Sequence, residues 1–184
     1  QKVPVAVYRI DLNYRMTPFI NDLMNATGVA VGPDGQVYIS SRFDGMVYQA
    51  SPSGNMSVYV EGMGVATGIA FDPAGNLYVS GPTTSSFDSI YRVKDNGDVE
   101  TFYRGLGRPQ GMAFDVDGNL YVAASWMGRK GVVRITQDQQ VEHVVSGPGI
   151  VGLAFSPSRA MIVATTNAIF RVDVGIRGYQ VAGA

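Results

Sequence analysis

The stretch Thr67–Gly81, TGIAFDPAGNLYVSG, decides the fold because it occurs in four related copies. The other copies are TGVAVGPDGQVYISS from Thr27, QGMAFDVDGNLYVAA from Gln110 and VGLAFSPSRAMIVAT from Val151. The glycine that opens each copy recurs with spacings of 40, 43 and 41 residues: Gly28, Gly68, Gly111 and Gly152. A period near forty residues with short strands inside it indicates an array of small, similar sheets.

Each copy is predicted to be a hairpin of two strands. In the copy from Thr67, the strands cover Gly68–Phe71 and Asn76–Val79, and Asp72–Gly75 forms the turn between them. The glycine of this turn supplies the positive φ that a tight hairpin requires. The fourth copy reads SPSRA where the others have that glycine, so a looser turn is predicted there.

A second pattern follows each hairpin and alternates apolar and polar residues with the period of a half-buried strand. It occurs five times, as a third strand: Val7–Ile10, Val47–Ala50, Ile90–Val93, Val132–Ile135 and Ile169–Val172. Fourth strands are predicted after four of these: Thr17–Asn21, Ser57–Glu61, Val99–Arg104 and Val141–Ser146. The unit is therefore a four-stranded antiparallel sheet, the blade of a β-propeller. An arginine recurs at one position of the third strands, which predicts ion pairs between blades: Arg9, Arg92, Arg134 and Arg171.

These units predict an all-β chain with a single β-propeller domain over residues 1–184 and about four blades covered. Blades begin near residues 27, 67, 110 and 151, and a partial blade occupies residues 5–24. The chain is expected to contain two strands, three full blades and three more strands, as part of a larger ring or one that a partner chain completes. A homo-oligomer could provide that completion. In an alternative, four blades close alone, with Thr17–Asn21 as the outer strand of the last.

Composition narrows the classes of function. The chain has 184 residues, 46% of them hydrophobic, a net charge of −1 and a pI near 5.7. That charge argues against binding to nucleic acid or anionic membranes, and no apolar run is long enough for a transmembrane helix. The first ten residues lack the pattern of a signal peptide. Because there are no cysteines, disulfides, thiolate metal sites and cysteine nucleophiles are excluded.

The pattern G-[IVM]-A-[FV]-x-x-x-G-[NQ]-[LV]-Y-[VI] resembles NHL-repeat propellers and the related gluconolactonase-like group. The resemblance extends from about Val7 to Val174. It implies a six-bladed ring, which at this period needs on the order of 240 residues. It also implies a secreted or periplasmic setting. It does not define an activity, because one fold carries many functions.

A binding surface is expected where the loops gather at one face of the propeller. The loops between second and third strands are Ser40–Gly45, Ser80–Ser89 and Ala124–Gly131, and others join successive blades. Aromatic rings beside arginine and aspartate are typical of binding surfaces. The alternative is that Trp126 packs on a neighbouring blade and the charges only solvate the rim. The candidate binding residues are Arg42, Asp44, Phe87, Asp88, Arg108, Trp126 and Arg129.

The predicted function is a non-enzymatic, NHL-like scaffold that binds a protein or carbohydrate partner through this face, without a cofactor. No catalytic residue or metal ligand is assigned. The alternative is a metal-dependent lactonase or esterase, because the gluconolactonase-like resemblance implies a divalent cation held by Glu, Asn and Asp near the starts of inner strands. None of these residue types precedes the repeated glycines, where the sequence has Thr27, Thr67, Gln110 and Val151.

Overall fold

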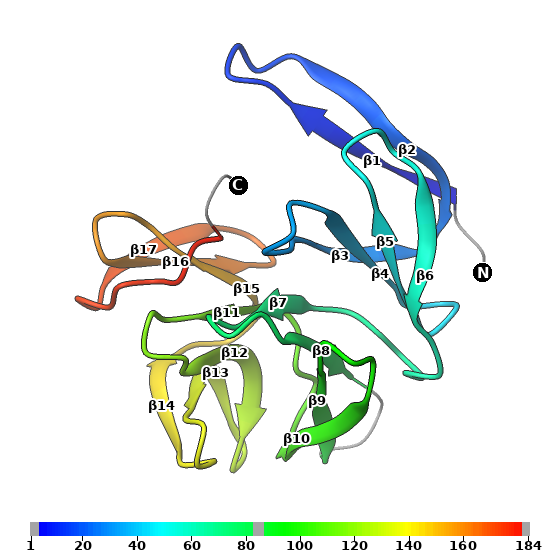
Figure 1. Cartoon of the computed structure of the whole chain (residues 1–184). Helices are drawn as coiled ribbons and strands as arrows, with labels where there is room; N and C mark the ends of the chain where they lie inside the picture. Colours follow the sequence, from blue (N-terminus) through cyan, green and yellow to red (C-terminus); the bar gives the residue numbers. More distant parts are fainter. Residues whose placement is uncertain (1–3, 83–86, 182–184) are drawn as a thin grey trace.

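The computed structural model describes residues 4–82 and 87–181 of the chain, and this part contains seventeen strands in five antiparallel sheets (Figure 1). Residues 83–86 of the predicted Ser80–Ser89 loop and both extremities of the predicted domain lie outside it. The first sheet is the hairpin β1 (Pro4–Ile10) and β2 (Met16–Met24). No helix capable of crossing a membrane occurs in the part described.

Three sheets have four strands each and one has three. The first blade contains β3 (Ala26–Val31), β4 (Val37–Ser41), β5 (Met46–Ala50) and β6 (Met56–Val60). The second contains β7 (Ile69–Phe71), β8 (Leu77–Gly81), β9 (Asp88–Val93) and β10 (Val99–Leu106). The third contains β11 (Met112–Phe114), β12 (Leu120–Trp126), β13 (Arg129–Ile135) and β14 (Val141–Ser146). The fourth contains β15 (Ile150–Phe155), β16 (Ala160–Thr165) and β17 (Ile169–Asp173).

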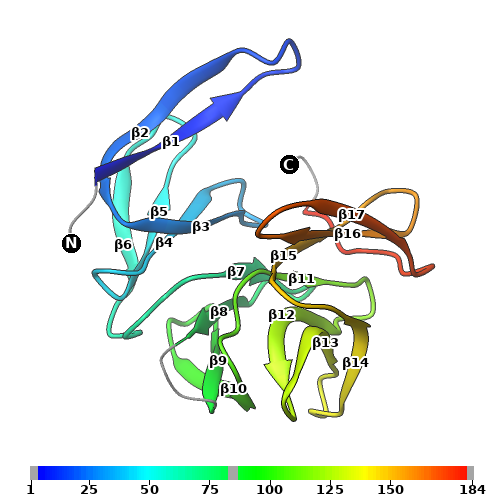
Figure 2. The same ribbon diagram turned by 180° about the vertical axis from the view of Figure 1, so that it is seen from behind.

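The blades are arranged as an open arc, with β3, β7, β11 and β15 at its centre (Figures 1 and 2). The division into two strands, three full blades and three strands is the one predicted from the repeat. The closed four-bladed alternative is wrong, because β2 pairs with β1 rather than completing the last sheet. Within the described residues, β17 pairs only with β16.

Aromatic pairs join successive blades. In the first three blades, a tyrosine of the second strand meets a phenylalanine of the next inner strand edge to face, with ring centroids 4.8–5.0 Å apart. Such pairs add about 0.5–1.5 kcal/mol beyond the area that they bury. They explain the Tyr and Phe of the repeated pattern as packing residues: Tyr38–Phe71, Tyr78–Phe114 and Tyr121–Phe155.

In the first three copies, the repeated glycine is required because adjacent inner strands approach closely at the axis. A Cβ on Gly28 would lie 2.3 Å from the carbonyl oxygen of Thr67, and one on Gly68 would lie 2.0 Å from that of Gln110. Real Cβ atoms do not come so near a backbone oxygen, so any side chain would separate the blades. The glycine thus fixes the spacing of the blades around the axis.

The hairpin turns keep one geometry in all four copies. Gly75 has a φ of 90°, and its N–H donates to the carbonyl of Asp72 at 3.0 Å. In the fourth copy, Arg159 adopts a φ of 63° and donates to the carbonyl of Ser156 at the same distance. The prediction of a looser turn there is wrong. The Ser156 hydroxyl accepts the N–H of Ala160 at 3.2 Å and holds the arginine in a left-handed conformation.

The turn carboxylate also anchors a buried tyrosine. The Tyr121 hydroxyl donates to Asp115 at 3.1 Å, and the Tyr38 hydroxyl donates to Asp34 at 2.9 Å. Asp34 stands two residues later in its turn than Asp115 does. Gly32 takes the earlier position, where a Cβ would lie 2.6 Å from the Asp34 carboxylate. The glycine therefore gives the displaced carboxylate room to reach its tyrosine.

The recurring arginines bind within blades, so the prediction of pairing between blades is wrong for three of them. Antiparallel register places Arg92 opposite Glu100, and Arg134 opposite Glu142, on adjacent third and fourth strands. Both pairs form ion contacts, the second at 3.1 Å, while Arg171 contacts Asp173 on its own strand. Only Arg9 reaches another sheet, where it donates to the carbonyl of Pro52 at 3.0 Å.

Candidate functional site

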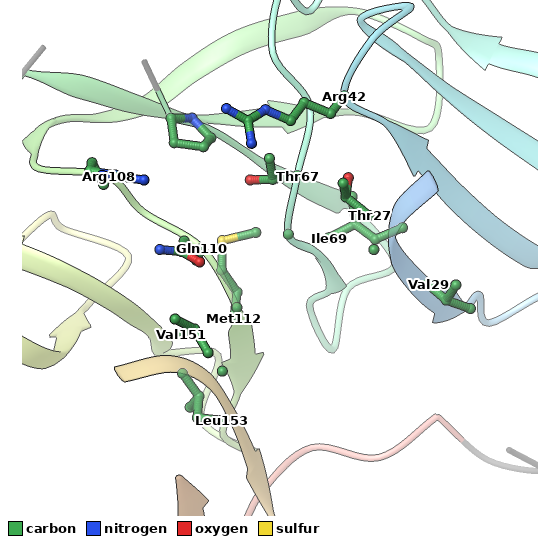
Figure 3. Close-up of a pocket in the computed structure, with 15 residues that line it drawn as sticks. Thr27, Val29, Arg42, Thr67, Ile69, Arg108, Gln110, Met112, Val151 and Leu153 are labelled. Carbon is green, nitrogen blue, oxygen red and sulfur yellow. The ribbon is translucent and has the colours of Figure 1, made fainter. Parts of the chain in front are cut away.

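A pocket of about 430 Å³ lies at the axis of the arc, where the inner strands begin (Figure 3). Each of the four blades contributes the repeated glycine and the residues on either side of it, and three loop residues complete the wall. We call this cavity the axial pocket. Its lining is Thr27, Gly28, Val29, Arg42, Thr67, Gly68, Ile69, Pro82, Arg108, Gln110, Gly111, Met112, Val151, Gly152 and Leu153.

Arg42 and Arg108 are the charged residues of the axial pocket and come from two different blades. Arg42 follows β4, and its backbone N–H donates to the carbonyl of Asn25 at 3.1 Å. Both side chains are exposed, and among the described residues neither guanidinium has a hydrogen bond or an ion pair. Loops within blades and loops between blades therefore meet at one face, as predicted, and offer two cations there.

Asp88 fixes the position of the Arg108 backbone through a hydrogen bond. Its side chain is only 3% exposed, and its Oδ2 accepts the backbone N–H of Arg108 at 3.0 Å. This bond holds Arg108 at a φ of 49°, a left-handed conformation that is costly for a residue with a side chain. Asp88 thus fixes the loop instead of facing the pocket.

Asp44 is also engaged inside its loop. It accepts the hydroxyls of Ser41 at 2.9 Å and Tyr48 at 3.2 Å. Burial, together with the Asp44 carboxylate, raises the pKa of Tyr48 above its ordinary value. Asp44 does not line the axial pocket, and its contacts define the turn after β4.

The remaining predicted residues lie outside the axial pocket. Trp126 is half-buried against the core and lies 5.5 Å from the ring of His143, whose Nε2 is 3.1 Å from the Trp126 carbonyl. Arg129 donates to the hydroxyl of Ser146 at 3.1 Å, and Phe87 is 67% exposed. The contacts of Trp126 agree with the packing alternative, and a binding role for these three residues stays a prediction.

A second cavity, of about 600 Å³, borders the axial pocket and shares Arg108, Gln110 and Val151 with it. We call it the side pocket. Its wall includes Lys130, which was not among the predicted site residues, and Ser125. In the sequence, Gln110 is distinguished only by its position before a repeated glycine. That position is the signal that could have placed it at the axis.

The fold and the axial pocket together define a β-propeller with a small-molecule-sized cavity at one end of its axis. Residues 37–167 match the family model described as SMP-30/Gluconolactonase/LRE-like region. Since this match covers more than half of the chain, the chain belongs to that family. The gluconolactonase-like part of the predicted resemblance is thereby confirmed. No match was found among curated protein sequences.

Solved structures share the fold at low identity. A structural genomics target proposed to be a gluconolactonase has a TM-score of 0.75 and 17% identity over 97% of this chain and 71% of its own. A gluconolactonase from Xanthomonas campestris has a TM-score of 0.74 and 14% identity, covering 89% and 64% respectively. Regucalcin from Agrobacterium tumefaciens, a calcium-binding protein, has a TM-score of 0.66 and 18% identity, covering 91% and 63%. The chain thus spans about two thirds of the length of these proteins.

The residues of the axial pocket do not fit the divalent cation that the gluconolactonase-like resemblance implies. A hard cation such as calcium needs several oxygen ligands, carboxylates above all. The described side chains that line the pocket include no carboxylate and no histidine, and the two guanidinium groups would repel a cation. In residues 4–82 and 87–181, no three His, Cys, Asp or Glu side chains are grouped to hold a metal.

Proposed function

We propose that the chain is a ligand-binding propeller that holds a small polar molecule of the carbohydrate type in its axial pocket. The observation that carries this proposal is the pair of guanidinium groups, Arg42 and Arg108, at a concave site whose described lining residues include no acidic side chain. Pockets of roughly 300–1,000 Å³ suit small ligands, whereas a protein partner needs a broader surface. Of the two predicted partner classes, a carbohydrate therefore fits better than a protein.

A second candidate function is hydrolysis of a lactone or ester. Membership of the gluconolactonase-like family supports this function more directly than it supports a scaffold without activity. The lining residues supply hydrogen bonds and positive charge for a ring oxygen or carboxylate. Among the described residues, the lining has no carboxylate and no imidazole to act as a general base or as a strong metal ligand, so no catalytic residue is assigned there.

Calorimetric titration with gluconate and activity measurements with its lactone test both functions. We expect gluconate to bind, with affinity lost in a variant carrying both Arg42→Ala and Arg108→Ala, and no turnover of the lactone above the uncatalysed rate. Lactone turnover that requires calcium or zinc would favour the second candidate. A ligand at one hundred times its dissociation constant stabilises the fold by about 2.7 kcal/mol, so thermal unfolding provides an independent reading. Absence of both binding and turnover would overturn the proposal.

A further inference from the structure

We propose that the axial pocket and the side pocket form one binding groove for an elongated carbohydrate that bears several carboxylates, such as a short oligouronate. This inference rests on the proposed function and extends it by naming the class of ligand. The two pockets share three lining residues, so a ligand longer than one sugar can continue from the first into the second.

The charges of the groove are spread along it and have one sign. Arg42 lines the axial pocket, Arg108 lines both pockets, and Lys130 lines the side pocket. Within residues 4–82 and 87–181, no Asp, Glu or His lines either of them. Among the described residues, none of these three cationic groups has a hydrogen bond or an ion pair of its own. Cations that no acid of the protein neutralises are arranged to meet anions of a ligand.

The rest of the wall favours an acidic sugar over a polyphosphate. Gln110 and Ser125 offer neutral donors and acceptors, which suit the hydroxyl groups of a carbohydrate. Three cations are few beside the roughly six to ten phosphate contacts of proteins that bind nucleic acid. Arginine forks also match the planar geometry of a carboxylate with two parallel hydrogen bonds.

Lys130 provides the discriminating variant, and Arg129 provides its matched control. The two residues are neighbours on β13, and successive side chains of a strand point to opposite faces. Lys130 lies opposite Ser125, which also lines the side pocket, whereas Arg129 donates to Ser146 outside both pockets. Alanine at either position removes one exposed positive charge, but only alanine at 130 changes the groove.

The experiment measures dissociation constants for an oligogalacturonate, the galacturonate monomer, a neutral oligosaccharide of the same length and inorganic tripolyphosphate. We expect the oligogalacturonate to bind most tightly. Lys130→Ala should weaken it about tenfold and leave the monomer unchanged, while Arg129→Ala should change neither. Arg42→Ala should weaken both, because both acids engage the axial pocket.

Several outcomes separate the two proposals. Equal affinity for the neutral and acidic oligosaccharides would overturn the inference and leave carbohydrate binding in place. Equal losses in the Lys130 and Arg129 variants would also overturn it, because general charge would then explain the effect. Tighter binding of tripolyphosphate would replace carboxylate by phosphate as the recognised group. Failure of every sugar to bind would overturn the proposed function itself.

Discussion

The Ser80 hydroxyl links two blades, because it donates to the carbonyl of Gln110 at 3.1 Å and accepts the N–H of Gly68 at 2.8 Å. It is fully buried. In the third blade, Ala123 stands at the equivalent position, and there the N–H of Gly111 donates directly to the next blade. Ser80 is therefore a bridging group inserted between a backbone donor and a backbone acceptor.

Ser80→Ala should lower the free energy of unfolding by about 1–3 kcal/mol, because it leaves a buried donor and a buried acceptor without their partner. Urea unfolding followed by circular dichroism measures the change. Ser53→Ala, in an exposed turn, serves as the control and should change stability by less than about 0.5 kcal/mol. An unchanged stability for Ser80→Ala would mean that Gly68 and Gln110 then bond directly.

Arg159→Gly should stabilise the protein by about 0.5–1 kcal/mol. The arginine holds a left-handed conformation that costs roughly 1–2 kcal/mol for an L-residue, and glycine removes most of that cost while making the unfolded chain more flexible. The reverse change, Gly75→Ala at the equivalent turn, should destabilise. Thermal unfolding of the two variants checks the signs, and a loss of stability in Arg159→Gly would contradict the strained turn.

Tyr121→Phe and Tyr78→Phe should differ although both tyrosines are fully buried in equivalent positions. The Tyr121 hydroxyl donates to Asp115, so its removal should cost about 1–3 kcal/mol. In the part of the chain that the structure describes, the Tyr78 hydroxyl has no partner in hydrogen-bond geometry, although Arg92 and Gln137 lie near enough to influence its pKa. Its removal should be neutral or slightly stabilising. Denaturant midpoints compare the pair, and equal costs would show that Tyr78 has a partner in solution.

Stability should fall as the pH rises above 10. Burial raises the pKa of Tyr38, Tyr59, Tyr78 and Tyr121 above the ordinary value of 10.0, since a buried phenolate is unfavourable. Groups with a raised pKa contribute stability below the unfolded value, and that contribution is lost as the pH rises towards the folded value. Unfolding midpoints measured across this range should decline less steeply in Tyr78→Phe than in the parent. An unchanged midpoint above pH 10 would contradict burial of these phenols.

The chain should associate with itself through its last blade. Among the described residues, β17 pairs on one side only, with β16, and it carries Ile169 and Phe170, which are 75% and 53% exposed. Unpaired edges with exposed apolar side chains pair with other strands. Light scattering after gel filtration should show a mass that rises with concentration, and Phe170→Lys should suppress the rise. Phe87→Lys on the loop face is the matched control, and suppression by both variants would contradict an interface at β17.

The repeat predicted the strands well because its hydrophobic period and turn glycines are local signals. Arg159 escaped prediction because its left-handed conformation depends on a neighbouring serine, and no pattern marks that. The intrablade partner of Arg92 is set by the register of two strands, which a recurring residue type does not specify. Both effects depend on contacts between residues in the folded chain, and a short segment of sequence carries little signal for them.

The site was predicted in part for the same reason. Loop membership alone predicted Arg42 and Arg108, which line the axial pocket, and their binding role stays a prediction. It also selected Asp44 and Asp88, whose carboxylates the structure uses to fix those loops. Lys130 is not among the predicted site residues, because its place on the same pocket wall as Arg108 follows from the folded arrangement of the loops. Carboxylates that anchor a loop are less exposed than side chains that face a ligand. That difference in exposure arises only in the folded protein, so the sequence does not reveal it.

Whether position 152 tolerates a side chain depends on what packs against β15 of the fourth blade. A Cβ there would meet only the Cβ of Ala164, at an ordinary 3.7 Å, whereas one on Gly111 would lie 2.7 Å from the Cα of Gly152. Gly111→Ala should therefore destabilise the fold. Gly152→Ala should be tolerated when only the described residues surround it. An inner strand packed beside β15 would make a side chain at position 152 as unfavourable as it is at Gly28, Gly68 and Gly111. The effect of alanine at position 152 on stability therefore shows whether another inner strand packs beside β15 and continues the propeller.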